Sequence, residues 1–121
     1  MSKKTGDWGE QMALKYLISN GAHILHQNWR SGRCELDIVG IENNTLVFYE
    51  VKVRKFGNPT DVFDAITDDK MKNLAKAASD YMETYDFMGE VRFDLLGFTY
   101  FDDHNYKIEH IRDVFFPGST W

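Results

Sequence analysis

Residues 34–54 read CELDIVGIENNTLVFYEVKVR and constrain the fold more than any other stretch of the chain. Two segments rich in Val, Ile, Phe and Tyr flank Asn43 and Asn44, and asparagine tolerates the positive φ that a two-residue hairpin turn needs. The sequence therefore predicts an antiparallel hairpin in which Glu42 faces Thr45.

The predicted turn sets the register of both strands, because successive side chains of a strand alternate between its two faces. One face then carries charged pairs toward the open end: Asp37 with Glu50, Glu35 with Lys52, and Arg33 with Arg54. The other face is apolar: Leu36, Ile38, Gly40, Val47, Tyr49, Val51 and Val53. A sheet that is covered on both faces and carries ionisable groups at one end is typical of a functional site.

Asp37 and Glu50 are expected to lie directly opposite each other, and like charges so placed destabilise a strand pair. A bound cation would relieve the repulsion. The alternatives are that the open end is solvated and the two acids splay, or that one carboxylate is protonated. The hairpin alone does not separate these possibilities.

The chain has 121 residues, which predicts a single domain over residues 1–121. Its one cysteine, Cys34, excludes an intramolecular disulfide and fits a reducing compartment. Asp7, Glu10 and Lys15 interrupt the apolar run that a signal peptide requires, and no segment is long enough to span a bilayer. We therefore expect a cytoplasmic protein with no membrane partner.

The net charge of −5 argues against general attraction to phosphate. A carboxylate cluster that binds divalent ions would carry several of these negative charges and lose them when loaded. The basic residues close to the hairpin are Arg33, Lys52, Arg54 and Lys55. The four histidines show no ligand spacing, so no zinc site is expected.

The first predicted helix covers residues 5–20 and ends at Gly21 as a left-handed cap. Glu10 lies at the head of its apolar stripe. The residues favour a capping box in which Asp7 is the N-cap and Glu10 its partner. In the alternative, Glu10 leans over the sheet toward Asp37.

The remaining pattern predicts a strand at 23–30, a short helix at 62–66, a long helix at 69–84 capped by Thr67 or Asp68, and strands at 91–101 and 106–111. The order is αβββαβ plus one strand, with a parallel crossover from the hairpin to the fourth strand. Arg92 and Asp94 are expected to form a structural salt bridge. Lys70 is expected on a solvated helix face, with a phosphate contact near the helix N-terminus as the alternative.

With this element order, the chain resembles the bacterial YraN-like family of the PD-(D/E)XK nuclease superfamily, which is similar to archaeal Holliday junction resolvases. The resemblance implies a restriction-endonuclease-like α/β fold with a mixed central sheet flanked by helices. The proline of the superfamily's name is absent. The matching residues are Gly9 and Glu10, Asn28, 35–38 (ELDI), 48–52 (FYEVK), Lys70, and 92–94 (RFD).

The resemblance also implies roles for individual residues. Asp37, Glu50 and the carbonyl of Val51 would hold Mg²⁺ or Mn²⁺, and Glu10 would complete or modulate the site. Lys52 would orient or deprotonate the attacking water, with Glu35 opposite holding its ammonium. The phosphate contacts would come from Arg33, Arg54 and Lys55.

Three functions follow, in this order. The first is a metal-dependent nuclease that acts on branched or irregular DNA. The second is a nucleic-acid-binding module of the same fold with little or no cleavage. The third is a protein-interaction domain whose acids are salt-bridged, which the acidic charge favours. Phe115, Phe116 and Trp121 suggest an apolar tail that a second copy in a homodimer would cover.

Overall fold

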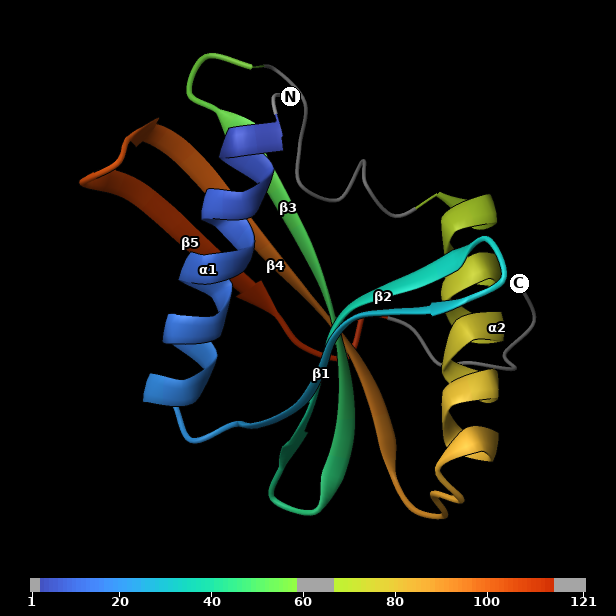
Figure 1. Ribbon diagram of the computed structural model, residues 1–121. Coiled ribbons are helices and arrows are strands. Elements are labelled where there is room, and N and C mark those ends of the chain that lie inside the picture. Colours follow the sequence, from blue (N-terminus) through green and yellow to red (C-terminus); the bar gives the residue numbers. More distant parts are fainter. Residues whose placement is uncertain (1–2, 59–66, 115–121) are drawn as a thin grey trace.

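The computed structural model describes residues 3–58 and 67–114 (Figure 1). The expected helix at 62–66 and the aromatic tail from Phe115 onward lie outside these residues. The elements are α1 (Lys3–Ser19), β1 (His23–Ser31), β2 (Cys34–Glu42), β3 (Thr45–Lys55), α2 (Asp68–Thr84), β4 (Val91–Asp102) and β5 (Asn105–Ile111).

One five-stranded sheet forms the centre of the molecule, with the strand order β1-β2-β3-β4-β5. Strands β3 and β4 are parallel and joined through α2, whereas the other neighbours are antiparallel. The predicted mixed sheet, flanked by helices in a restriction-endonuclease-like core, is therefore confirmed (Figure 1).

The β2–β3 turn has the predicted geometry, with φ of 47° at Asn43 and 68° at Asn44. The predicted register holds from Glu42–Thr45 to Ile38–Tyr49. Beyond that pair the ladder ends, because β2 bends away from β3 toward α2 (Figure 1). The expected pairing of Asp37 with Glu50 across the ladder is therefore wrong as a strand pair.

The two outer pairs of the predicted register are also wrong. Arg33 lies in the turn between β1 and β2 and does not face Arg54. Glu35 forms an ion pair with Arg30 on β1, at 3.1 Å, in place of the expected contact with Lys52. Both errors have one cause, which is that the part of β2 before Ile38 is separated from β3.

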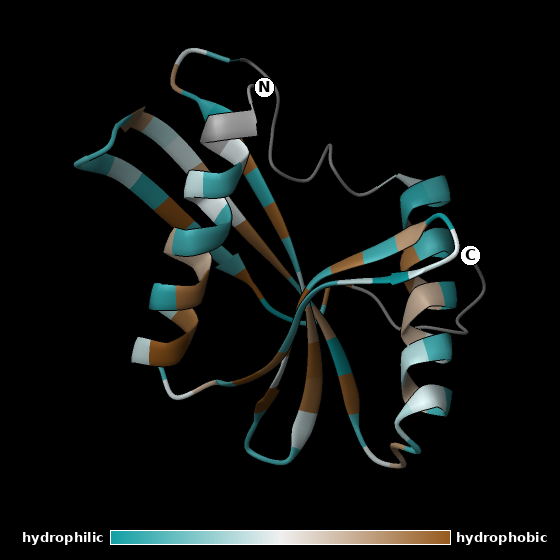
Figure 2. Ribbon diagram, in the orientation of Figure 1, coloured by the Kyte–Doolittle hydropathy of each residue, from teal (hydrophilic) through white to brown (hydrophobic). Residues whose placement is uncertain are grey.

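Two apolar cores lie on the two faces of the sheet. Ala13 and Leu17 of α1 pack with one set of strand residues, and Leu74 and Tyr81 of α2 pack with the other. In Figure 2 hydrophobic residues recur along the strands between the helices, whereas the outer side of α2 is mostly hydrophilic. Burial of these two helix faces supplies the main driving force for the layered arrangement.

The hairpin's predicted apolar face is divided between these cores. Ile38 packs on the α1 side, as do Val47, Tyr49 and Val53. Leu36, two residues before Ile38, packs instead on the α2 side. Residues two positions apart in a regular strand have their side chains on the same face. Leu36 and Ile38 do not, so β2 must be irregular between them, at Asp37. On the neighbouring β1, Asn28 has a φ of 51°, so the irregularity extends across both strands.

Two predicted helix caps are confirmed and a third is wrong. Gly21 follows helix α1 as a left-handed cap, with φ of 90°, and the N–H of Ala22 donates to the carbonyl of Leu17 at 3.0 Å. Helix α2 begins after Thr67, whose hydroxyl accepts from the N–H of Lys70 at 3.1 Å. The predicted capping box is wrong, because α1 already begins at Lys3 and contains Asp7 and Glu10.

Gly9 marks a close approach of α1 to β3. A Cβ added at Gly9 would lie 2.1 Å from a methyl carbon of Val53, whereas one added at Gly6 meets nothing within 4 Å. We expect Gly9→Ala to lower the free energy of unfolding by about 1 to 2 kcal/mol, because overpacking outweighs the gain in helix propensity. The matched control, Gly6→Ala, is expected to raise it by about 0.5 to 1 kcal/mol. Urea denaturation of both variants tests this, and equal stabilisation would contradict the tight contact.

Candidate functional site

The candidate site lies where β2 separates from β3. The carboxylate of Asp37 accepts a hydrogen bond from the N–H of Val51 at 2.9 Å. The N–H and C=O of one strand residue point to the same side of the strand, so the carbonyl of Val51 is directed to this edge as well. Where the β2–β3 ladder ends, the carboxylate of Asp37 and the carbonyl oxygen of Val51 therefore lie at the same edge of β3.

Glu50 is the buried acid of the site, with 9% of its surface exposed. Its Oε1 atom lies 3.0 Å from the ammonium of Lys70 on α2. Its Oε2 atom is fully buried and makes no hydrogen bond within the described residues. Burial raises the pKa of Glu50, and the charge of Lys70 opposes that rise. One oxygen of the Glu50 carboxylate thus has a partner, and the other oxygen is buried without one in the described part of the chain.

Asp37 is held next to Glu50 in the same apolar setting. Leu36, Phe48 and Leu74 line the pocket behind the two acids. Burial raises the pKa of Asp37 to about 7, and the negative charge of Glu50 adds to the effect. The repulsion expected from the sequence is therefore present, although the two residues are not a strand pair.

Glu10 reaches the site from α1 and is held there by Asn28 of β1. With the amide assigned so that its nitrogen faces the acids, Asn28 donates to Glu10 at 3.1 Å and to Glu35 at 3.0 Å. Burial raises the pKa of Glu10, the bond from Asn28 opposes it, and the charge of Asp37 adds to the rise. The left-handed backbone of Asn28 thus belongs to the site.

Of the predicted basic residues, Lys52 is the one that is found to act on these acids within the described part of the chain. Lys52 is exposed, and its charge acts on Glu50. Arg54 and Lys55 lie at the end of β3, where Arg54 forms an ion pair with Glu109 at 3.7 Å. Arg33 is exposed at the tip of the β1–β2 hairpin. The structure thus brings the acids together. The β1–β2 turn, which carries Arg33, and the end of β3, which carries Arg54, lie on separate parts of the molecule (Figure 1).

Lys70 belongs to the site, and the expected solvated position is wrong. Its side chain pairs with Glu50. Partial burial lowers the pKa of Lys70, but the charge and hydrogen bond of Glu50, together with the charges of Asp37 and Glu35, outweigh this effect, so the net shift of the pKa is upward. A sequence signal existed, because Lys70 follows the predicted cap Thr67 by one turn and was among the residues of the family resemblance.

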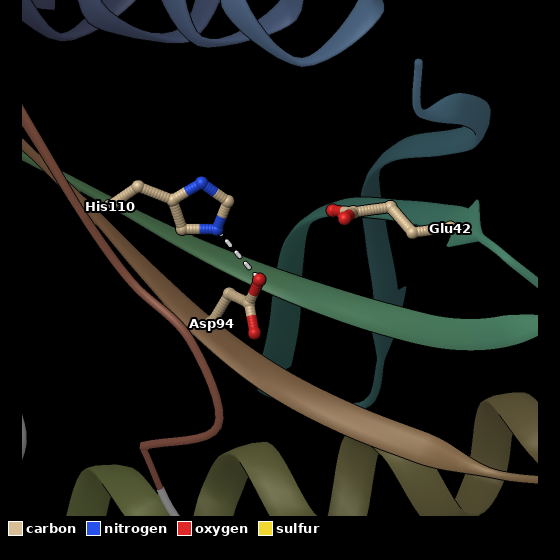
Figure 3. Close-up of side chains that lie close together, drawn as sticks. All are labelled: Glu42, Asp94 and His110. Carbon is tan, nitrogen blue, oxygen red and sulfur yellow. Dashed lines mark hydrogen bonds and ion pairs between the residues drawn. The ribbon is translucent and has the colours of Figure 1, made fainter. Parts of the chain in front are cut away.

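A second polar cluster lies elsewhere in the sheet. Glu42, Asp94 and His110 each offer a ligand atom within 4.8 Å of the others, which fits metal binding (Figure 3). His110 was not expected to take part in such a cluster. Its Nε2 atom lies 2.7 Å from Asp94, and its Nδ1 atom lies 2.9 Å from the hydroxyl of Tyr16 on α1.

Arg92 already supplies a cation to this second cluster. Its guanidinium makes two hydrogen bonds to Asp94, at 2.8 and 2.9 Å, and an ion pair with Glu42 at 3.2 Å. Asp94 also accepts from the N–H of Asp113. Burial opposes ionisation of Asp94, but the bonds from His110 and Arg92 outweigh it and lower the pKa of that carboxyl. The expected Arg92–Asp94 salt bridge is confirmed, and it gives this cluster a structural role.

The family model described as "Uncharacterised protein family UPF0102" matches residues 9–98. This chain belongs to that family. The resemblance to YraN-like proteins is thereby confirmed. The matched range contains the whole first cluster, from Glu10 to Lys70, but ends before His110 of the second cluster.

Relatives with the same family name match nearly the whole chain. A UPF0102 protein of Phocaeicola vulgatus is 39% identical over 115 residues, which are 93% of this chain and 92% of the relative. One of Bacteroides thetaiotaomicron is 38% identical with the same coverage. One of Syntrophomonas wolfei is 38% identical over 119 residues, which are 95% of this chain and 100% of the relative.

The UPF0102 fold described here gives no sign of a membrane span. Within residues 3–58 and 67–114, neither helix has the length and apolar character needed to cross a bilayer.

The pKa of Asp37 predicts how stability of the metal-free UPF0102 chain varies with pH. The folded-state pKa is about 7 and the ordinary value is 3.8, so the folded state holds a proton in this interval that the unfolded state has released. The stabilisation is full below about pH 4 and is lost as pH rises through about 7. The loss is up to about 4 kcal/mol, from about three pKa units.

This prediction is checked by urea denaturation in EDTA between pH 4 and 8, with Asp37→Asn as the matched variant. The difference in unfolding free energy between variant and wild type should grow in favour of the variant as pH rises. A difference that stays constant across this range would contradict a raised pKa at Asp37.

Proposed function

We propose that this UPF0102 chain is a divalent-metal-dependent nuclease that hydrolyses phosphodiester bonds in branched or irregular DNA. The observation that carries the proposal is the buried, unpartnered Oε2 atom of Glu50 beside Asp37, whose pKa is raised to about 7. Two desolvated carboxylates at close range favour a bound cation, and perturbed acids of this kind are concentrated at functional sites.

The donor set fits Mg²⁺ or Mn²⁺. Asp37, Glu50 and the carbonyl of Val51 would hold the ion, and Glu10 would complete or modulate the site from α1. All of these donors are oxygens, which such hard cations prefer. When bound, the ion would supply Lewis-acid stabilisation and lower the pKa of a coordinated water, so that a hydroxide nucleophile forms more readily at neutral pH.

The chain's own cations would handle the phosphate and the attacking water. Lys52 is exposed and close enough for its charge to act on Glu50, so its ammonium is available to orient a water or offset phosphate charge. Arg33, Arg54 and Lys55 would contact flanking phosphates. Because Arg33 and Arg54 lie on separate parts of the fold, they would contact phosphates on different sides of the site.

The proposal is tested by incubating the purified chain with a four-way junction, a flap, a single strand and a duplex in Mg²⁺, Mn²⁺ or EDTA. We expect cleavage of branched DNA with either metal and none in EDTA. Glu50→Gln should abolish cleavage, whereas Glu83→Gln, at an exposed acid on α2, should leave it unchanged.

The other outcomes of the same assay separate the competing functions. DNA binding with steep salt dependence but no cleavage in either metal would support a binding module of this fold and overturn the nuclease. Neither binding nor cleavage would favour a protein-interaction domain in which Lys70 and Glu50 form a structural ion pair.

A further inference from the structure

The sheet face that carries Glu50 and Lys52 continues beyond the candidate site without a helix over it, within the described residues. Helix α2 packs on β1 and β2, and its buried residues reach Phe48 and Phe93. Farther along β3, Arg54 lies beside Thr99 of β4, which lies beside Lys107 of β5. This uncovered strip is therefore continuous with the acids of the site.

Two exposed aromatic rings lie at the end of the strip. Phe56, just after β3, is 69% exposed, and Phe101 of β4 is 41% exposed. Their rings stack on each other, with centroids 4.6 Å apart and planes inclined by 29°. The N–H of Phe56 donates to the carbonyl of Tyr100 at 2.9 Å, which ties the turn to the sheet. The pair therefore offers a fixed and exposed aromatic surface on which a planar ligand can stack.

Cations surround the aromatic pair. Phe56 and Phe101 line a groove of about 270 Å³. Lys55, Lys107 and Arg54 line it as well. Both lysines are exposed and form no ion pair within the described residues, whereas Arg54 contacts Glu109 and Thr99.

The described acids near the groove are engaged by other groups. Among residues 3–58 and 67–114, Glu109 is the one acid that lines the groove, and it contacts Arg54. Asp102 accepts hydrogen bonds within its own turn, and Asp103 accepts from the hydroxyl of Tyr100.

We propose that this groove, defined by Phe56, Phe101, Lys55 and Lys107, binds unpaired nucleotides of a nucleic acid. Stacking on aromatic rings requires a base whose face is not covered by its neighbours, as in single strands and at branch points. The two lysines contact the phosphates that flank the stacked base. Lys55 lies three residues beyond Lys52 on β3, about 10 Å away along an extended strand. Its side chain leaves the strand on the opposite face from Lys52 and lines the groove at the end of the strand.

The inference rests on the proposed nuclease for its biological meaning, because it assigns the substrate class as DNA with an unpaired segment beside the cleaved phosphate. Binding at the groove does not itself need metal or cleavage. The two proposals can therefore fail separately.

The test is fluorescence anisotropy in EDTA with a labelled oligothymidine single strand and, separately, a fully paired duplex of mixed sequence. We expect the single strand to bind more tightly than the duplex. Phe56→Ala and Phe101→Ala should each weaken single-strand binding by about 5- to 150-fold and change duplex binding little, because a stacked base contributes about 1 to 3 kcal/mol. Phe56→Trp should retain binding.

Matched controls address charge and folding. Lys55→Gln and Lys107→Gln should each reduce the salt slope of single-strand binding by about 0.7. Ile18→Ala removes another exposed apolar side chain, on α1, and should leave binding unchanged. The thermal midpoint of each variant shows whether it is folded, and only folded variants are compared.

Equal losses for single strand and duplex, or no loss in either aromatic variant, would overturn the groove. A change in oligomeric state in Phe56→Ala, measured by sedimentation with unaltered binding, would show that a second copy covers the rings and would also overturn it. Loss of single-strand binding in a chain that cleaves nothing would support the groove and overturn the nuclease.

Discussion

Lys52→Ala is expected to reduce metal-dependent cleavage of branched DNA by about 10²- to 10⁴-fold while leaving DNA affinity within a few-fold. The reason is that Lys52 is exposed beside the acids and, on our proposal, acts on the water or the reacting phosphate. Its loss removes one phosphate contact among several, so the salt slope of duplex binding should fall by about one. Single-turnover cleavage in Mn²⁺ and anisotropy in EDTA measure the two quantities.

Lys72→Ala is the matched control, because Lys72 is an exposed lysine on α2. It should change neither cleavage nor affinity by more than a small factor. If Lys52→Ala cleaves as fast as the wild type, Lys52 has no catalytic role. If cleavage falls only in proportion to affinity, Lys52 is one more phosphate contact, as the binding-module hypothesis requires.

The second large effect concerns metal binding by the folded chain in the absence of DNA. Mg²⁺ or Mn²⁺ at 100 times its dissociation constant should stabilise the wild type by about 2.7 kcal/mol. Asp37→Asn should remove this stabilisation. Without metal, the variant should be as stable as the wild type or more stable at neutral pH, because Asp37 is buried beside the like charge of Glu50.

Thermal or urea denaturation with and without metal tests both halves of this prediction. Glu83→Gln serves as the control and should keep the wild-type response, since it removes an exposed acid far along α2. A metal response of equal size in Asp37→Asn would exclude Asp37 as a ligand. It would direct attention to Glu42, Asp94 and His110 as the alternative ligand group.

The sequence alone determined the features that depend on neighbouring residues. Asn43 and Asn44 predicted the turn, and the turn predicted the five strand pairs down to Ile38–Tyr49. Gly21 and Thr67 predicted helix termini, since a left-handed cap and a hydroxyl cap act within one turn. The element order and the spacing of the acids were sufficient for the fold and for the family.

The tertiary structure alone decided which distant groups meet at the site. The side chain of Asn28 joins Glu10 to Glu35, and Lys70 pairs with Glu50 from the first turn of α2. The turn predicts that the β2–β3 ladder also includes the residues of β2 before Ile38. In the structure this part of β2 bends toward α2 and buries Leu36 against that helix. Periodicity describes contacts within one element, whereas bending and ion pairing depend on the apolar surfaces and charges that other elements bring to the same place.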